Sequence, residues 1–187
     1  MKKMFALLLS LILALSCCAA LADEAPAKTE LGSIRMNGAF KLQCNLPEGY
    51  QIDILTKDDE GLIALIEAED KTKPQMFLVI EYDEVYSEVK RMNDMTEEQL
   101  QQIIDTFSND GDEVTVSYRE TSHGTKLMLA QEAVDSIDFL AILSVYEGYM
   151  IEFDMFAGKD ATEGLSESQI QMCVDFLSDL DFIPEEA

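Results

Sequence analysis

The sequence predicts an α+β domain in which an antiparallel sheet of about six to seven strands is flanked by two helices. Three observations support this fold class. Most apolar runs are short and are joined by turn residues, which favours antiparallel pairing. Two other segments carry apolar residues at helical spacing. The last two strand-like runs are apolar on both faces, so they require cover on both sides of the sheet.

The first 22 residues have the features of a cleavable signal peptide in the expected order. A pair of lysines precedes an apolar stretch at residues 5–15, which is too short to cross a bilayer, and small residues end the leader at Ala22. We therefore expect cleavage after Ala22 and a protein that is secreted or otherwise extracytoplasmic, with no membrane insertion after cleavage. Cys17 and Cys18 leave an alternative, a lipoprotein anchored at the membrane through one of them, although their flanks fit a lipobox poorly.

Cleavage would leave a single domain with a strongly acidic surface. Residues 23–33 are expected to form a flexible tether, and residues 34–187 one folded domain. The leader contains two of the 13 basic residues and none of the 37 acidic ones, so cleavage would change the net charge from −24 to −26. Such a charge disfavours nucleic acid and anionic lipid, and it suits a solvated surface, a cation or a basic partner.

Three strands are predicted before the first helix. Residues 40–46 alternate between apolar and polar side chains, and a Pro-Glu-Gly turn at residues 47–49 ends this strand. Two further apolar runs, residues 62–68 and 76–82, are separated by a polar loop at residues 71–74.

Both predicted helices begin with the same capping sequence. Thr96 and Gln99 form a capping box at the first helix, and Ser166 and Gln169 repeat it at the second, so that side chains satisfy backbone groups of the first turn. Pro184 is expected to end the second helix. The apolar stripes are Leu100, Ile103, Ile104 and Phe107 in the first helix, and Ile170, Cys173, Val174 and Leu177 in the second.

Four more strands are expected between the helices, after an Asn-Asp-Gly stop at residues 109–111. A Ser-His-Gly turn at residues 122–124 is typical of a hairpin, and the Glu-Gly pair at residues 147–148 predicts another. The four runs are residues 114–118, 127–130, 139–146 and 149–156.

This order of elements resembles the PsbP-like fold, an αβα sandwich built on an antiparallel sheet. The resemblance lies in the Leu-Pro-Glu-Gly-Tyr turn at residues 46–50, the late hairpin at residues 146–149 with its aromatic strand, and the terminal helix at residues 166–180. It spans about residues 38–183. The resemblance implies a binding or assembly role, and it transfers no site residue because no shared site motif is visible.

No catalytic constellation is visible in the chain. The only histidine, His123, lies in a predicted turn, and Cys44 and Cys173 lie on apolar stripes, which argues against an activated nucleophile. The spacing of these residues makes no zinc motif, and no phosphate-binding glycine loop is present. The sequence therefore predicts a non-enzymatic binding or assembly protein without a cofactor. Its partner is an unidentified protein or small ligand, for which the charge favours a basic one.

Two alternatives use the acidic residues. The loops at residues 58–61 and 110–113 carry carboxylates that suit a calcium or other cation site, although neither has the EF-hand spacing. A hydrolase that uses carboxylates alone would instead place two of them across a pocket at roughly 5–10 Å.

Asp175 and Asp179 lie four residues apart on the expected outer face of the last helix, where they form a solvated face or contact a basic partner.

The two cysteines of the expected mature chain have two interpretations. Cys44 faces the core from the first predicted strand, and Cys173 from the last helix, so export permits a disulfide between them. Two buried thiols that act as small apolar core residues are the alternative.

Overall fold

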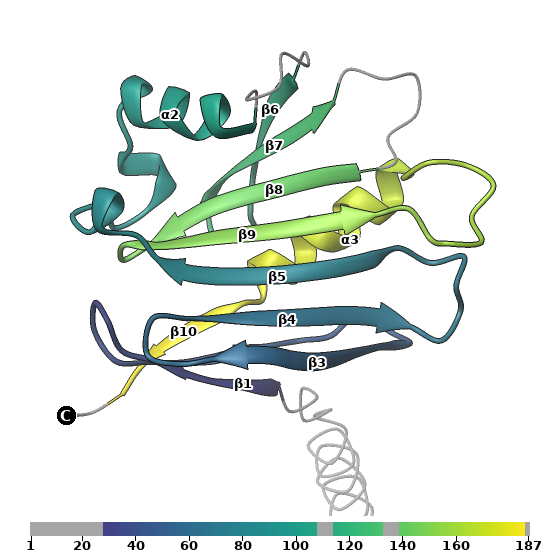
Figure 1. Cartoon of the computed structure of the whole chain (residues 1–187), viewed down its shortest axis with the longest axis horizontal. Coiled ribbons are helices and arrows are strands. Elements are labelled where there is room, and N and C mark those ends of the chain that lie inside the picture. Colours follow the sequence, from purple (N-terminus) through teal and green to yellow (C-terminus); the bar gives the residue numbers. More distant parts are fainter. Residues whose placement is uncertain (1–27, 108–113, 133–138, 186–187) are drawn as a thin grey trace, which may run out of the picture.

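The computed structural model describes residues 28–107, 114–132 and 139–185 of the 187-residue chain. The described residues form a seven-stranded antiparallel sheet, a three-stranded sheet, two α-helices and two short 3-10 helices (Figure 1). The predicted α+β class is confirmed. The elements are β1 (Thr29–Ile34), β2 (Phe40–Cys44), β3 (Tyr50–Lys57), β4 (Gly61–Ala68), β5 (Gln75–Tyr82), η1 (Glu84–Tyr86), η2 (Met92–Asp94), α2 (Glu97–Phe107), β6 (Val114–Glu120), β7 (Lys126–Glu132), β8 (Phe139–Tyr146), β9 (Tyr149–Phe156), α3 (Glu167–Ser178) and β10 (Asp181–Pro184).

The large sheet has the strand order β3-β4-β5-β9-β8-β7-β6, and the small sheet the order β1-β2-β10. Hairpins join most neighbouring strands of the large sheet, as the turn residues predict. At the β8–β9 turn, Glu147 and Gly148 both have positive φ, at 49° and 81°, which is the conformation that a tight hairpin requires. The pairing of β5 with β9 is the long-range contact that joins the two halves of the sheet.

The large sheet buries side chains on both faces. On one face, α3 and the small sheet share a core with the strands, and on the other, η1, η2 and α2 pack against β7 and β8 (Figure 1). We call these the α3 face and the α2 face. Along β8, Leu140 and Ile142 enter the first core, whereas Ala141 and Leu143 enter the second. The two-faced burial predicted for this strand is confirmed.

Both capping boxes are formed. The backbone N–H of Gln99 donates to Thr96 Oγ1 at 3.2 Å, and the backbone N–H of Thr96 donates to Gln99 Oε1 at 3.0 Å. Ser166 and Gln169 make the same reciprocal pair ahead of α3, at 2.7 and 3.4 Å. The stop predicted at residues 109–111 lies outside the described residues.

The expected tether is wrong in its second half. Residues 29–33 belong to β1, which pairs with β2 and buries Leu31 and Ile34, so the folded domain begins earlier than position 34. Cross-strand pairing thus fixes a segment whose polar composition indicated a free linker. Residues 23–27 and the leader lie outside the described residues. Within the described ranges, no helix is long and apolar enough to cross a membrane.

Pro184 does not end the last helix. The helix α3 is already closed at Asp179, and the chain turns into β10, which pairs with β2 in the small sheet. Pro184 is the last residue of this edge strand, a position that tolerates a missing backbone donor.

Candidate functional site

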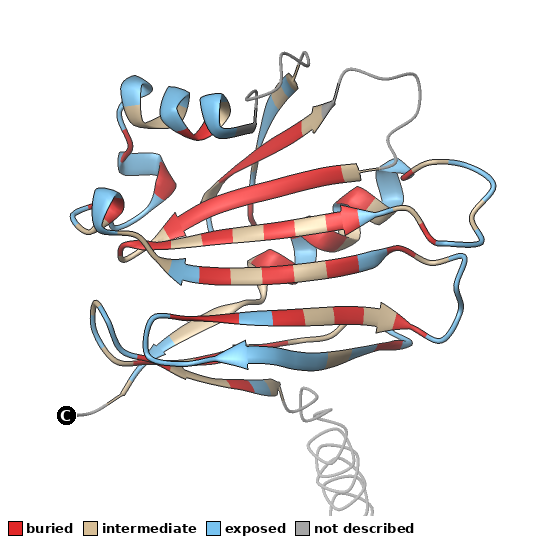
Figure 2. Ribbon diagram, viewed as in Figure 1, coloured by how far each residue is buried: buried red, intermediate tan, exposed pale blue. Residues whose placement is uncertain are grey.

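The α2 face of the large sheet is only partly covered. The buried cluster beneath α2 draws mainly on β7 and β8, whereas on β4 and β5 the side chains of this face are half-buried or exposed. Figure 2 shows this as an alternation of buried and intermediate residues along β5 and β9. Ile63 on β4 is 38% exposed, and Phe77 and Val79 on β5 are half-buried. An open surface with apolar side chains therefore lies beside α2.

A groove of about 720 Å³ runs along the border between this surface and its cover. Its floor is apolar and its rim is acidic. Such a combination of apolar walls and a few convergent polar groups is typical of binding sites. The lining residues are Val79, Glu81, Tyr82, Asp83, Glu84, Val85, Tyr86, Ile103, Thr106, Leu143, Met150 and Glu152.

Two carboxyl groups on β9 are the chemically unusual feature beside this groove: Glu152 lines it, and Asp154 lies next to Glu152 on the same face of the strand, outside the lining. Glu152 and Asp154 are two residues apart on one strand, so both side chains lie on the α2 face. Their cross-strand neighbours on β5 are Val79 and Phe77, which are both apolar. The two carboxyl groups are hydrogen-bonded to each other. The pair is thus held in a half-buried, mostly apolar environment.

This environment raises the pKa of both groups. Burial raises the pKa of Glu152 to about 7, with further contributions from the Asp154 charge, from the hydrogen bond to Asp154 and from the Glu81 charge. Burial also raises the pKa of Asp154 above its ordinary value, while the hydrogen bond from Glu152 opposes that change. Near neutral pH the pair therefore holds one proton part of the time. Strongly shifted carboxyl groups in a groove are typical of functional sites.

One oxygen of the pair lacks a hydrogen-bond donor. Asp154 Oδ1 is buried and has no hydrogen-bond partner within the described ranges. An unfilled buried acceptor costs about 1–3 kcal/mol. Asp154 is therefore short of one hydrogen-bond donor.

Aromatic rings lie near Asp154 on the same face of the sheet, outside the groove lining. Phe77 and Phe156 meet edge to face with centroids 6.0 Å apart, and Phe139 lies 4.9 Å from Phe156. Phe156 is 39% exposed, so part of this aromatic shelf is open to solvent. Aromatic faces beside carboxylates suit cations that carry an apolar stem.

The sequence reasoning missed Glu152 and Asp154. A signal was present, because the two carboxylates alternate with Ile151, Phe153 and Met155 in a run predicted to lie mid-sheet. Charged residues in a strand with cover on both sides are costly unless they are paired or functional.

The acidic loop at residues 58–61 is an ordinary turn. Asp58 Oδ1 accepts hydrogen bonds from the backbone N–H groups of Glu60 and Gly61, at 2.9 and 3.0 Å. Within the part of the chain that the structure describes, no group of three or more metal-ligating side chains is placed to hold a metal ion. The second candidate loop, at residues 110–113, lies outside the described residues.

Asp175 and Asp179 both line a shallow pocket beside α3, but they differ in exposure. Asp175 is exposed and accepts from the Gln171 side chain at 2.9 Å. Asp179 is half-buried at the end of α3, where it accepts from the Asn45 amide at 3.3 Å. Asp175 therefore lies on the solvated face of α3, as expected, whereas Asp179 is half-buried at the C-terminal end of the helix. His123 lies exposed in the β6–β7 turn, away from the groove.

Cys44 and Cys173 are both buried and both free in the structure. The Cys173 thiol lies 3.1 Å from Met155 Sδ and 3.5 Å from Met76 Sδ, within the core beneath α3. Burial raises the pKa of Cys44 to about 11 and that of Cys173 to about 12. Both sulfurs are free thiols in the structure, and the disulfide stays a prediction.

We expect both thiols to resist alkylation in the folded protein, because the reactive thiolate is scarce and the sulfurs are buried. Iodoacetamide should add two groups under non-reducing conditions in denaturant and none without it, as read by intact mass. A denatured chain that gains no mass until it is reduced would show the bridge instead.

No protein-family model matches the chain, and no curated protein matches it. Among solved structures, the chain is similar to the solution structure of cyanobacterial PsbP (CyanoP) from Synechocystis sp. PCC 6803. The TM-score is 0.49 and the identity 14%, over 86% of this chain and 95% of that one. This is the family that the element order of the sequence resembles. At this identity, neither function nor site residues pass from that protein to this chain.

Proposed function

We propose that the protein is an exported, non-enzymatic binding protein and that the groove on the α2 face binds a cationic, partly apolar segment of its partner. The leader supports export. One observation carries the choice of ligand: Glu152 lines the groove and is hydrogen-bonded to Asp154, whose buried Oδ1 has no hydrogen-bond partner within the described residues. A donor that is positively charged and attached to an apolar stem satisfies both features.

An arginine side chain fits these requirements best. Its planar guanidinium presents several N–H donors to neighbouring carboxylate oxygens, which gives charge-assisted hydrogen bonds. Its methylene stem would lie against Val79 and Met150 of the groove floor. The charge of −26 expected for the mature chain would also attract a cationic partner over long range.

A carboxylate-only hydrolase gains no support from this pair. Glu152 and Asp154 lie on the same strand and are hydrogen-bonded to each other. That arrangement leaves no room for the reacting sugar, which the known two-carboxylate mechanisms place between carboxyl groups about 5–10 Å apart.

Binding of a labelled peptide tests the proposal. The probe is a fluorescein-labelled peptide of alternating Arg and Leu, compared with alternating Gln and Leu and alternating Glu and Leu peptides. We expect the Arg peptide to bind. Asp154→Asn and Glu152→Gln should each lower its affinity about tenfold, which corresponds to the loss of one charge-assisted hydrogen bond.

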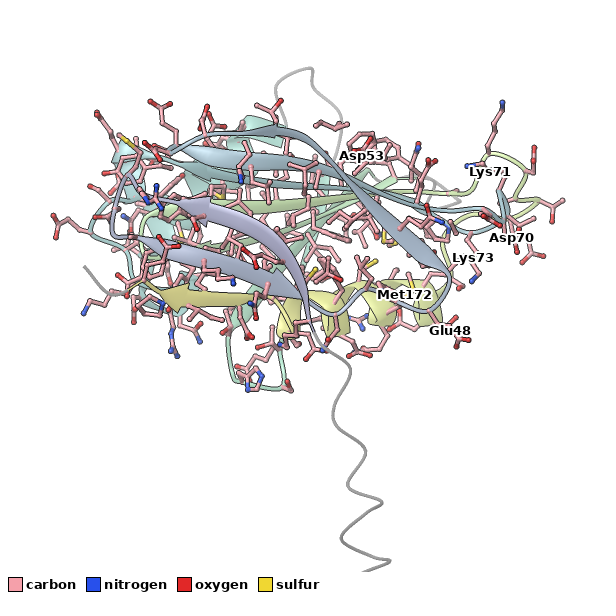
Figure 3. The ribbon with its side chains drawn as sticks, turned by 90° about the horizontal axis from the view of Figure 1, so that it is seen from below. Glu48, Asp53, Asp70, Lys71, Lys73 and Met172 are labelled. Carbon is pink, nitrogen blue, oxygen red and sulfur yellow. The ribbon has the colours of Figure 1, made fainter. Side chains whose placement is uncertain are left out.

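Asp53→Asn is the matched control. Asp53 pairs with Leu65, Leu65 with Phe77 and Phe77 with Asp154, so both aspartates lie in one row on one face of the sheet. Asp53 is exposed on the edge strand, and in Figure 3 it lies on the opposite side of the sheet from α3 and Met172. Equal losses in Asp53→Asn and Asp154→Asn would indicate net charge alone and would refute a built site.

A further inference from the structure

A second cavity, of about 400 Å³, lies on the α3 face. It is enclosed by the end of α3 and by β10 on one side, and by β8 and the β6–β7 turn on the other. Figure 1 shows α3 and β10 behind the large sheet, on the side away from α2. The cavity shares no lining residue with the groove. Its volume falls within the range of about 300–1,000 Å³ that is usual for small-ligand sites.

Two buried hydroxyl groups line this cavity. Ser144 on β8 is 3% exposed, and its same-face neighbours along the strand are Ile142 and Tyr146. Its Oγ donates to the Lys126 carbonyl at 3.3 Å, which leaves the oxygen lone pairs free. Thr121 is 8% exposed, and its Oγ1 accepts from the Thr125 N–H at 3.0 Å. Buried hydroxyl groups among apolar side chains are informative, because apolar residues usually fill such positions.

Positively charged and titratable groups lie at the edge of the cavity. Arg91 and His123 both line it and are both exposed. Within the described ranges, no carboxylate pairs with Arg91, although five other basic side chains of this acidic protein do form ion pairs. Asp181 also lines the cavity, but its carboxylate is neutralised by Lys28 at 2.9 Å. Arg91 is therefore a cation available to a ligand.

Apart from Thr125 and Ser178, the remaining walls are mostly apolar. Leu127, Ile151 and Leu177 are buried core residues, and Phe182 of β10 closes one side. A cation at the edge, hydroxyl groups inside and hydrocarbon walls together match a small molecule with an anionic end and an apolar body.

We propose that this cavity binds a small amphipathic carboxylate. Its carboxylate would lie at Arg91, and its hydrocarbon would replace water along Leu127, Ile151 and Leu177. Transfer of that hydrocarbon out of water supplies the main favourable free energy, whereas the guanidinium selects an anion over a cation or an alcohol. The proposal does not depend on the groove on the opposite face.

Calorimetric titration with decanoate, decanol and decyltrimethylammonium tests this inference. We expect decanoate to bind, and the alcohol and the cation to bind at least about tenfold more weakly. Arg91→Gln should lower the affinity for decanoate about tenfold, which corresponds to the loss of one charge-assisted interaction. Lys90→Gln, which removes the same charge from the neighbouring exposed residue outside the cavity lining, should leave the affinity unchanged.

Amide chemical shifts locate the bound decanoate independently of any variant. Saturable shifts at Ser144 and Leu177, with none at Glu152, would support the cavity. Shifts confined to the groove, or equal affinities for decanoate and decanol, would overturn the proposal. Equal losses of affinity in Arg91→Gln and Lys90→Gln would also overturn it.

Discussion

Phe153→Ala is expected to lower the free energy of unfolding by about 3–5 kcal/mol. Phe153 is fully buried on β9, in the middle of the large sheet, and its ring lies 5.1 Å from that of Phe176 on α3. The substitution would leave a cavity between the sheet and the helix that closes the core. Urea denaturation, monitored by circular dichroism, measures the loss of stability. The urea concentration at the midpoint should fall, with little change in the slope of the transition.

Phe156→Ala is the control for this loss. It removes the same side chain three residues along the same strand, but Phe156 lies on the α2 face and is 39% exposed. We expect a cost of about 1 kcal/mol or less. Equal losses for the two variants would mean that the core beneath α3 is not the main stabilising contact of the fold.

Local patterns predicted those elements whose burial follows the sequence directly. The strands β4, β5, β8 and β9 are apolar runs of ordinary strand length, and each lies within the large sheet. The two helices begin where capping boxes start them. In these segments the side-chain pattern and the final environment agree, so periodicity and capping chemistry suffice.

Three strands escaped the sequence reasoning, because β1 and β3 lack a clean alternation and β10 pairs with a strand that is distant in sequence. The edge strand β3 has an irregular register between Ile54 and Thr56, so its exposed residues show no clean alternation. The strand β10 follows α3 directly and gains its place only by pairing with β2, which is distant in sequence. The strand β1 is polar in part and is fixed by the same small sheet.

The candidate site could be predicted only in part for a similar reason. The sequence shows that Glu152 and Asp154 interrupt an apolar run, but not that this face of β9 borders an open groove. That depends on where α2 and η1 pack, which is set by their contacts with β7 and β8. Coverage of a sheet face is a tertiary property, and local periodicity carries no information on which strands a helix covers.

Wild-type protein is expected to lose about 2 kcal/mol of stability between pH 5 and pH 8 through Glu152, once solvent screening of this half-exposed carboxyl is allowed for. In the folded state its pKa is raised from 4.5 to about 7, by burial first and then by the neighbouring Asp154 and Glu81 charges. The folded protein therefore binds more protons than the unfolded chain between these two pKa values. The contribution of Glu152 to stability is fully present below about pH 4.5, and it is lost as the pH rises through 7.

The raised pKa of Asp154 acts in the same direction, since burial favours its protonated form as well. The carboxyls with lowered pKa, Asp70 and Glu185, act below this window, because they stay ionised in both states above pH 5. Glu152→Gln should therefore reduce the change in the free energy of unfolding between pH 5 and pH 8. At pH 8 the variant should be more stable than wild type, as measured by urea denaturation at each pH.

Asp53→Asn should retain the wild-type slope, because its carboxyl is exposed at the edge of the same face. A slope that survives in Glu152→Gln would place the pH dependence in the general repulsion of an acidic surface and not in the pair. The same titration affects ligand binding, because a cationic peptide meets a protonated pair at pH 5 and an ionised pair at pH 8. Its affinity should therefore rise across the interval in which the unliganded protein loses stability, and Glu152→Gln should reduce both changes together.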